Sequence, residues 1–348
     1  MSDSPSGSGS ESGGGFFPYL ETFAKGSLAT AGTLATIGAG LIYYGQNYLI
    51  YPSAYVNIGP DNGVVHTPTE DYGLAAEELE LRTSDGILIR AYLLKQQKEL
   101  PEPKRFKQLP VSPLNYDDAE SDEDIMKRRP TIVYFHGNGG NFGHRLPLGM
   151  MLQMYLRCNV LMVSYRGYGG SEGSPSEKGL QIDAQTALDY VTSEPRLAKT
   201  PIIIYGQSIG GAVAIDLASR NPDKIKALIL ENTFTSIPNL VPHVLPVLGP
   251  FTFLCHQKWD SASKVPLIPP TTPVLLLSGV QDQIVPQEHM KTLRELFLQR
   301  GAKGGERNPV EKSRWEEFEH GSHNDTTSQR GYWSCIEEFL ESLRDKSR

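Results

Sequence analysis

The chain has 348 residues, of which 39% are hydrophobic, enough for one large core or two small ones. Its 33 basic and 40 acidic side chains give a formal net charge of -7. No run of Lys and Arg interrupts this acidic balance, so we expect no nucleic-acid partner. The three cysteines are far apart and lack CxxC spacing, which predicts buried thiols and argues against a disulfide framework or a zinc site: Cys158, Cys255 and Cys335.

The N-terminal part of the chain divides into two segments. Residues 1–25 contain a long Ser- and Gly-rich stretch that predicts a disordered tail. Residues 26–52 carry no charge and are long enough for a transmembrane signal-anchor helix. A cleaved signal peptide and a soluble helix are the alternatives, because threonines and amides dilute the apolar character of this segment. The single charge just before it, Lys25, favours a cytosolic N-terminus. We therefore expect a single-pass membrane protein of the endoplasmic reticulum or another endomembrane.

A hairpin and an insertion follow the N-terminal segments. Residues 78–83 and 87–94 flank the turn Ser84-Asp85-Gly86 and predict two antiparallel strands. Residues 96–129 are rich in Pro and charged side chains and lack apolar periodicity. This composition predicts a mobile, solvated insertion between strands.

Short apolar runs then alternate with segments of helix length. The runs lack polar alternation, which is typical of strands covered on both faces: residues 131–135, 159–165, 201–205, 227–230 and 273–278. The helical segments between them include residues 180–193, 209–220 and 287–299. The pattern predicts a mostly parallel central sheet flanked by helices, in a domain spanning residues 75–346. Its chemistry should gather at the carboxyl ends of the strands.

The pattern GxSxG occurs twice, at residues 169–173 and 206–210. The first copy runs into Pro175 and has no helix directly behind it, so it predicts a loop. The second copy stands between an apolar run and an Ala-rich helical segment, which is the strand, sharp turn and helix of a nucleophile elbow. We therefore predict Ser208 as a catalytic nucleophile.

A serine nucleophile needs a base and a carboxylate that orients the base. After an elbow serine the acid is expected first and the histidine second. Asp282 follows the apolar run at residues 273–278 and is the preferred acid, with Glu231 and Asp260 as competitors. Two histidines near the C-terminus compete for the role of base, and their spacing does not distinguish them: His320 and His323.

An acyl-transfer site also needs backbone N–H groups that stabilise an oxyanion. The residue after the nucleophile, Ile209, supplies one such group. The second should come from the loop at residues 136–141, with Asn138 or Gly139 as donor. We expect no cofactor, since this loop has no GxGxxG spacing and no P-loop is present, and no metal, since HExxH and other ligand spacings are missing.

Five motifs occur in one order: HGNGGN, YRGYGGSEG, GQSIGG, SGVQDQIVP and GSHND. Together they make the chain similar to the bud-emergence branch of the α/β-hydrolases, from about residue 79 to the C-terminus apart from the insertion. The resemblance implies an α/β-hydrolase fold and a membrane-anchored serine hydrolase. It also implies a triad of Ser208, Asp282 and His323, because the base of the family lies in the pattern that residues 321–325 match. His320 is thereby disfavoured.

Residues 235–262 predict a short lid over the site. They are apolar but carry a proline about once per helical turn, which favours short helical pieces. Apolar surface beside a reactive serine suits an acyl chain, although such a segment can simply pack on the sheet. We expect hydrolysis of an acyl ester or thioester, on a lipid or protein, at a membrane. The alternatives are a serine peptidase of the same fold and a catalytically silent membrane scaffold.

Overall fold

The computed structural model of the chain describes residues 33, 36–56, 64–109, 111–301 and 312–344. The chain divides into two compact units, Met1–Gly45 and Gln46–Arg348. The predicted disordered tail lies outside the described residues, as does part of the predicted membrane segment. Residues 36–50 are helical. Within the described ranges, no helix combines the length and apolar character needed to cross a bilayer.

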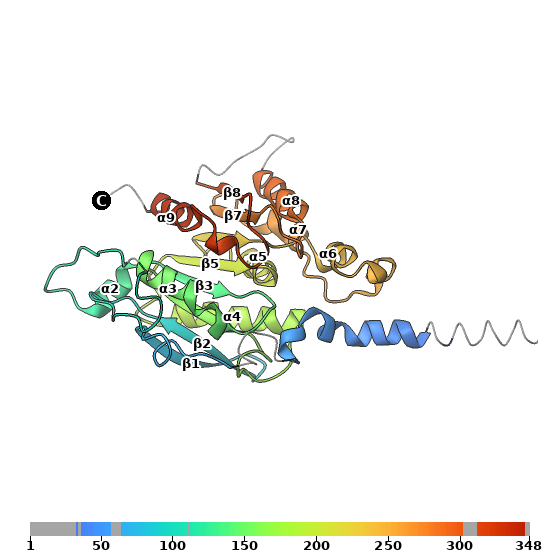
Figure 1. Ribbon diagram of the computed structural model, residues 1–348, viewed down its shortest axis with the longest axis horizontal. Coiled ribbons are helices and arrows are strands. Elements are labelled where there is room, and N and C mark those ends of the chain that lie inside the picture. Colours follow the sequence, from blue (N-terminus) through green and yellow to red (C-terminus); the bar gives the residue numbers. More distant parts are fainter. Residues whose placement is uncertain (1–32, 34–35, 57–63, 110, 302–311, 345–348) are drawn as a thin grey trace, which may run out of the picture. The chain divides into compact units, whose positions relative to one another are not determined.

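The larger unit is built on a sheet that has eight strands in the described part of the chain, in the order β1-β2-β4-β3-β5-β6-β7-β8 (Figure 1). The second strand runs antiparallel to both of its neighbours, and the other pairs are parallel. The predicted mostly parallel sheet is confirmed. The strand bounds are β1 (Ala76–Arg82), β2 (Leu88–Leu94), β3 (Thr131–Phe135), β4 (Asn159–Ser164), β5 (Ile202–Gln207), β6 (Ala227–Glu231), β7 (Val274–Gly279) and β8 (Arg314–Phe318).

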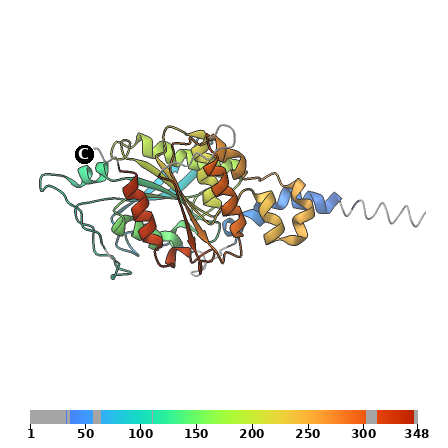
Figure 2. The same cartoon turned by 90° about the horizontal axis from the view of Figure 1, so that it is seen from above.

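Helices cover both faces of this sheet (Figure 2). Side chains of α4 (Glu177–Ser193), α5 (Ile209–Arg220) and α8 (Gln287–Leu298) belong to the core on one face. Side chains of α3 (Leu146–Met150) and α9 (Tyr332–Ser342) belong to the core on the other. Every residue of β3 to β7 is buried, which explains why these strands are continuous apolar runs in the sequence.

The remaining helical segments are short. They are η1 (Pro52–Ala54), α2 (Asp122–Arg128), η2 (Phe142–Arg145), η3 (Met151–Tyr155), α6 (Ile237–Val244), η4 (Pro246–Leu254), α7 (Ser261–Lys264), η5 (Val265–Leu267) and η6 (Thr326–Ser328). A loop connects β8 to α9, and η6 is the only described helical segment in it.

The insertion at residues 96–129 is not solvated throughout, and in this respect the sequence expectation is wrong. Its α2 begins with a capping box in which Ser121 and Asp124 bond each other's backbone N–H groups. Ile125 and Met126 of this helix are buried against the domain. At the other end of the insertion, the buried Gln96 side chain donates hydrogen bonds to backbone carbonyls of the domain. The capping box is a sequence signal for the start of this helix, and the charged composition of the segment made it easy to overlook.

The lid region consists of short helical pieces, as its prolines predict. The α-helix α6 is followed by the 3₁₀ helix η4 and the single turn α7. One side of α6 is buried at Ile237 and Leu240. The η4 segment instead leaves large apolar side chains in solvent, with Val247 83% and Phe253 78% exposed.

Candidate functional site

Ser208 occupies the tight turn between β5 and α5. Its backbone has φ 55° and ψ -120°, a region that non-glycine residues rarely adopt and that costs about 1–3 kcal/mol. The turn also requires glycines on both sides, because a Cβ at Gly206 would overlap the carbonyl of Gly210, and one at Gly210 would overlap that of Phe135. The strain persists because the buried strand and helix fix the turn at both ends. This is the geometry of a nucleophile elbow.

The structure brings Ser208, His323 and Asp282 together from three loops. His323 Nε2 lies 3.0 Å from Ser208 Oγ, and His323 Nδ1 lies 2.7 Å from Asp282 Oδ2. All three side chains lie at the carboxyl edge of the parallel strands, where the sequence analysis expected them. The other oxygen of Asp282 accepts the backbone N–H groups of Ile284 and Val285, at 2.9 and 2.8 Å. These bonds fix the carboxylate so that it faces the imidazole.

Asn232 positions the loop that carries His323, and the sequence analysis missed it. It follows β6 directly, is buried, and accepts the N–H of Gly279 at the end of β7 with a 2.8 Å bond. Its amide nitrogen donates to Thr326 Oγ1 at 2.9 Å and lies 3.4 Å from the carbonyl oxygen of His323. Asn232 therefore links the end of the strand before Asp282 to the histidine loop. Its backbone has a φ of 44°, a conformation that Asn adopts more readily than most residues.

The competing candidates lie elsewhere. The His320 side chain is exposed, and its Nδ1 lies 3.5 Å from the amide nitrogen of Gln281. Asp260 accepts the N–H of Ser263 and so caps the short α7. Neither residue contacts Ser208 in the described structure.

Glu231 is fully buried beneath the elbow and is bound in a network of its own. Its carboxylate accepts hydrogen bonds from the hydroxyls of Tyr205 and Tyr332, at 2.5 and 2.7 Å, and from the amide of Gln207 at 3.2 Å. Burial raises the pKa of Glu231 above its ordinary value, while these donors oppose the rise. Its backbone carbonyl accepts the N–H of Ser208. Glu231 thus stabilises the turn through its backbone carbonyl, and its carboxylate forms no hydrogen bond with the imidazole of His323 in the described structure.

The loop after β3 lies beside Ser208. A Cβ added to Gly137 would stand 3.5 Å from Cβ of Ser208, an ordinary van der Waals distance, so this loop packs directly beside the elbow. The Asn138 side chain turns away, since its amide donates to the carbonyl of Ile50 and its oxygen accepts the Tyr168 hydroxyl at 2.5 Å. The side chain of Asn138 is therefore engaged elsewhere and offers no donor to Ser208. On the other side, Ile209 is the first residue of α5, where a helix leaves its N–H groups without an internal partner.

Burial also excludes a further histidine as a base. His136, which opens this loop, is fully buried, and this lowers its pKa to about 3. It is therefore neutral at physiological pH. Its backbone carbonyl accepts the hydroxyl of Tyr165 at 3.0 Å, which anchors the loop.

Residues 46–53 contact both the lid and the loop after β3. The Gln46 side chain donates to the carbonyl of Leu254 and accepts the N–H of His256, both at 2.9 Å. Tyr51 is completely buried, and its hydroxyl accepts the indole N–H of Trp259 at 2.8 Å. Ser53 Oγ accepts the N–H of Gly140 at 3.0 Å. The end of the uncharged segment is therefore packed against the predicted lid and against the loop beside Ser208.

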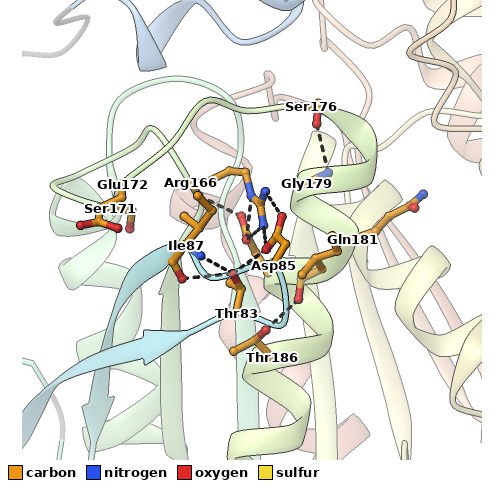
Figure 3. A network of polar contacts seen from close by, with 12 residues as sticks. Thr83, Asp85, Ile87, Arg166, Ser171, Glu172, Ser176, Gly179, Gln181 and Thr186 are labelled. Atoms are coloured by element: carbon orange, nitrogen blue, oxygen red, sulfur yellow. Dashed lines mark hydrogen bonds and ion pairs between the residues drawn. The ribbon is translucent and has the colours of Figure 1, made fainter.

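The first GxSxG copy forms a structural loop (Figure 3). Ser171 Oγ donates to the carbonyl of Ser164 and accepts the N–H of Arg90, both at 2.9 Å. The same loop carries Arg166, which forms ion pairs with Asp85 in the β1–β2 turn and with the buried Asp183 of α4, at 2.7 and 2.9 Å. These contacts fix the segment that presents Tyr165 and Tyr168 to the loop beside Ser208. The hydroxyl of Ser171 is thus engaged in holding the loop.

Comparison with known proteins agrees with the fold. The sequence profile of the α/β-hydrolase fold family matches residues 130–249. Esterase Pf2001 of Pyrococcus furiosus has a TM-score of 0.60 at 16% identity, over 82% of this chain and 97% of that chain. At this identity the likeness concerns the fold. The strand order, the elbow and these matches define an α/β-hydrolase.

Two full-length relatives identify the branch. Protein bem46 of Schizosaccharomyces pombe is 42% identical, over 93% of this chain and 94% of its own length. The uncharacterized membrane protein YNL320W of Saccharomyces cerevisiae is 35% identical, over 88% of this chain and 93% of its own length. The chain belongs to the bem46 family of α/β-hydrolases, as its motifs suggest.

Proposed function

We propose that the protein is a serine hydrolase that cleaves an acyl ester or thioester through an acyl-enzyme on Ser208. One observation carries the proposal: the hydrogen-bonded chain from Ser208 Oγ through the His323 imidazole to Asp282. This arrangement supplies a nucleophile, a base within reach of its proton, and a carboxylate that holds the base. The membership of the α/β-hydrolase family agrees with hydrolysis as the reaction.

The contacts support a proposed role for each residue. His323 Nε2 accepts the Ser208 proton while Oγ attacks the acyl carbonyl, and Asp282 stabilises the imidazolium through Nδ1–H. The imidazolium then gives its proton to the leaving alcohol or thiol, which frees it and leaves an acyl-serine. Water, activated by the same imidazole, hydrolyses the acyl-serine and releases a carboxylic acid. In both steps the backbone N–H of Ile209, with that of Asn138 or Gly139, would stabilise the negative oxygen.

The lid supports an acyl substrate. Residues 236–257 contain no Asp, Glu, Lys or Arg, and η4 exposes Val247 and Phe253. Apolar side chains of this kind match an acyl chain better than a polar peptide. The preceding residues 46–53 contact this lid, and they end the uncharged segment that we propose as a membrane anchor. We therefore place the substrate, an acylated lipid or protein, at an endomembrane to which a single-pass helix tethers the enzyme.

The serine chemistry is tested by labelling with a fluorophosphonate probe, which reacts with activated serines. The wild type should be labelled, and Ser208→Ala should not. Ser171→Ala is the matched control, since it removes a hydroxyl from the other GxSxG copy and should leave labelling intact. Within the histidine loop, His323→Ala should slow labelling by roughly a thousandfold or more, while His320→Ala should not. Labelling of folded Ser208→Ala, or none of folded wild type, would contradict the proposal.

The substrate class is tested with p-nitrophenyl esters and thioesters of graded acyl length. We expect hydrolysis, with preference for chains long enough to reach the lid. Activity confined to peptide amides would reject the acyl-ester assignment and support a serine peptidase on the same triad. If the probe labels Ser208 but none of these substrates is hydrolysed, the assignment of the substrate class is wrong while the serine chemistry stands.

A further inference from the structure

A pocket of about 340 Å³ lies at the amino ends of β3 and β4. Since β3 and β5 are parallel, this edge of the sheet is opposite to the one that carries Ser208. Its wall includes residues 112–115 of the insertion and the end of α9. The function proposed above assigns no role to this pocket or to the insertion that closes it.

Four arginines line the pocket: Arg128, Arg129, Arg157 and Arg344. Among the described residues only Arg128 has an acidic partner, with its Nε 3.3 Å from Glu120. Glu337 and Glu341 also line the pocket, but neither forms an ion pair with these arginines there. The Glu337 carboxylate instead accepts the hydroxyl of Tyr155 at 2.6 Å. Positive charge therefore dominates locally, in a protein whose net charge is negative.

Arg157 is the most deeply buried of the four, at 2% exposure. Its Nη2 donates to the carbonyls of Gln97 and Lys98 at 3.0 and 3.1 Å. Its Nε and Nη1 are buried and have no hydrogen-bond partner in the described structure. Burial, together with repulsion from Arg129, lowers the pKa of Arg157 to about 10.

Arg129 is half-buried and also lacks an acidic partner among the described residues. Its Nε and Nη2 donate to the carbonyls of Arg157 and Leu156, at 2.5 and 3.0 Å. Burial lowers its pKa as well, and the charge of Arg344 contributes. Carbonyl dipoles satisfy hydrogen bonds, but they supply no counter-charge. Buried charges in proteins are normally paired, because an unpaired one carries a large desolvation cost.

We propose that this pocket binds a phosphate-type anion, either inorganic phosphate or the head of a phosphomonoester. With Glu120 counted as the partner of Arg128, four guanidiniums face three carboxylates, and a bound phosphate offsets the excess of positive charge. The planar guanidinium matches the oxygen geometry of phosphate. The anion lies beside Arg157 and Arg129 and provides the missing counter-charge. Because residues 112–115 close the pocket, binding also fastens the insertion to the domain.

Thermal unfolding of the full-length protein in detergent tests the site. Inorganic phosphate, titrated at constant ionic strength against chloride, should raise the Tm with saturation, because a ligand that binds only the folded state stabilises it. Arg344→Gln should weaken the apparent affinity by about tenfold or more, and Arg129→Gln likewise. Arg344 is exposed, so its replacement should not prevent folding.

Arg330→Gln is the matched control, since it removes the same charge from an exposed position near the other end of α9. It should bind phosphate like the wild type, and so should Ser208→Ala, which separates this site from the catalytic proposal. A saturable response that is the same in Arg344→Gln, Arg129→Gln and wild type would overturn the assignment. An unsaturable or absent response in wild type would do so too. Calorimetry with dioctanoyl phosphatidic acid then distinguishes the source: tighter binding than phosphate indicates a lipid head group, and equal binding a free phosphate.

Discussion

At the scale of single residues, Asn232 shows how the site depends on a side chain that takes no part in the chemistry. It joins Gly279 of one strand end to the loop of His323 by hydrogen bonds that are almost entirely buried. The distance between His323 and Ser208 is set by this loop. The alignment of the proposed base therefore depends on this amide as well as on Asp282.

Replacing this amide should affect turnover more than stability. We expect Asn232→Ala to lower kcat by about tenfold to a hundredfold, since small displacements of a base cost this much, with little change in KM. The variant should also lose about 1–3 kcal/mol of unfolding free energy, because the buried groups that Asn232 bonds are left without a partner. Ester hydrolysis and urea unfolding, measured on the same preparation, give both numbers.

Asn221→Ala is the control for this variant. Asn221 follows the end of α5, away from Ser208, Asp282 and His323. Its side-chain amide donates to the carbonyl of Leu217 in α5 and to the side-chain oxygen of Gln185 in α4. It should lose stability and keep its kcat. If Asn232→Ala has the same kcat as Asn221→Ala, then Asn232 contributes to stability alone and does not position the base.

Individual site residues differed in how far the sequence could predict them. Ser208 stands between a buried strand and an Ala-rich helix, so its place in the chain revealed its geometry. His320 and His323 are three residues apart in an irregular loop, where no periodicity fixes direction, and only the family motif separated them. Asn232 bonds to residues about 90 positions away, and no local pattern records such a contact.

At the scale of elements, the ion pairs of Arg166 join three parts of the chain: the β1–β2 turn, the loop after β4 and helix α4 (Figure 3). The two acidic partners differ in burial. The Asp183 side chain is 0% exposed and that of Asp85 is 39% exposed. Arg166 also donates its backbone N–H to Asp183, at 2.9 Å. The buried partner should therefore carry most of the energy.

The two carboxylates allow a matched comparison. Asp183→Asn should lower the free energy of unfolding by about 3–5 kcal/mol, because it removes the buried charge partner of a buried guanidinium and leaves only the more exposed Asp85. Asp85→Asn should lower it by about 1 kcal/mol or less, since solvent screens the exposed pair. Guanidinium chloride unfolding measures both. Equal losses would mean that the turn anchors the loop as strongly as the helix does, which would contradict this prediction.

The elements themselves were predictable where burial is complete. The run at residues 131–135 and the segment at residues 209–220 match β3 and α5, because every residue of β3 and all but the last two of α5 are buried, which makes both segments mostly apolar. The α2 helix was missed because its exposed face is charged and only two of its side chains are buried. Short helices in a charged segment depend on capping and on distant contacts, and periodicity does not capture either.

At the scale of the whole molecule, the proposed anchor makes a direct prediction. A segment that spans a bilayer stays in the membrane pellet after extraction with alkaline carbonate, whereas a peripherally bound protein is released. The full-length protein should remain in the pellet. A variant that lacks residues 26–45 should move to the supernatant, and release of the full-length chain would contradict the single-pass proposal.

The contacts of residues 46–53 have a practical consequence for where the chain can be cut. Tyr51 fills space next to Trp259, and Ile50 and Ser53 hold the loop beside Ser208. A cut that preserves these contacts must therefore fall before Gln46. A cut a few residues later would remove the support of the loop beside Ser208, and we expect the released domain to lose the proposed activity.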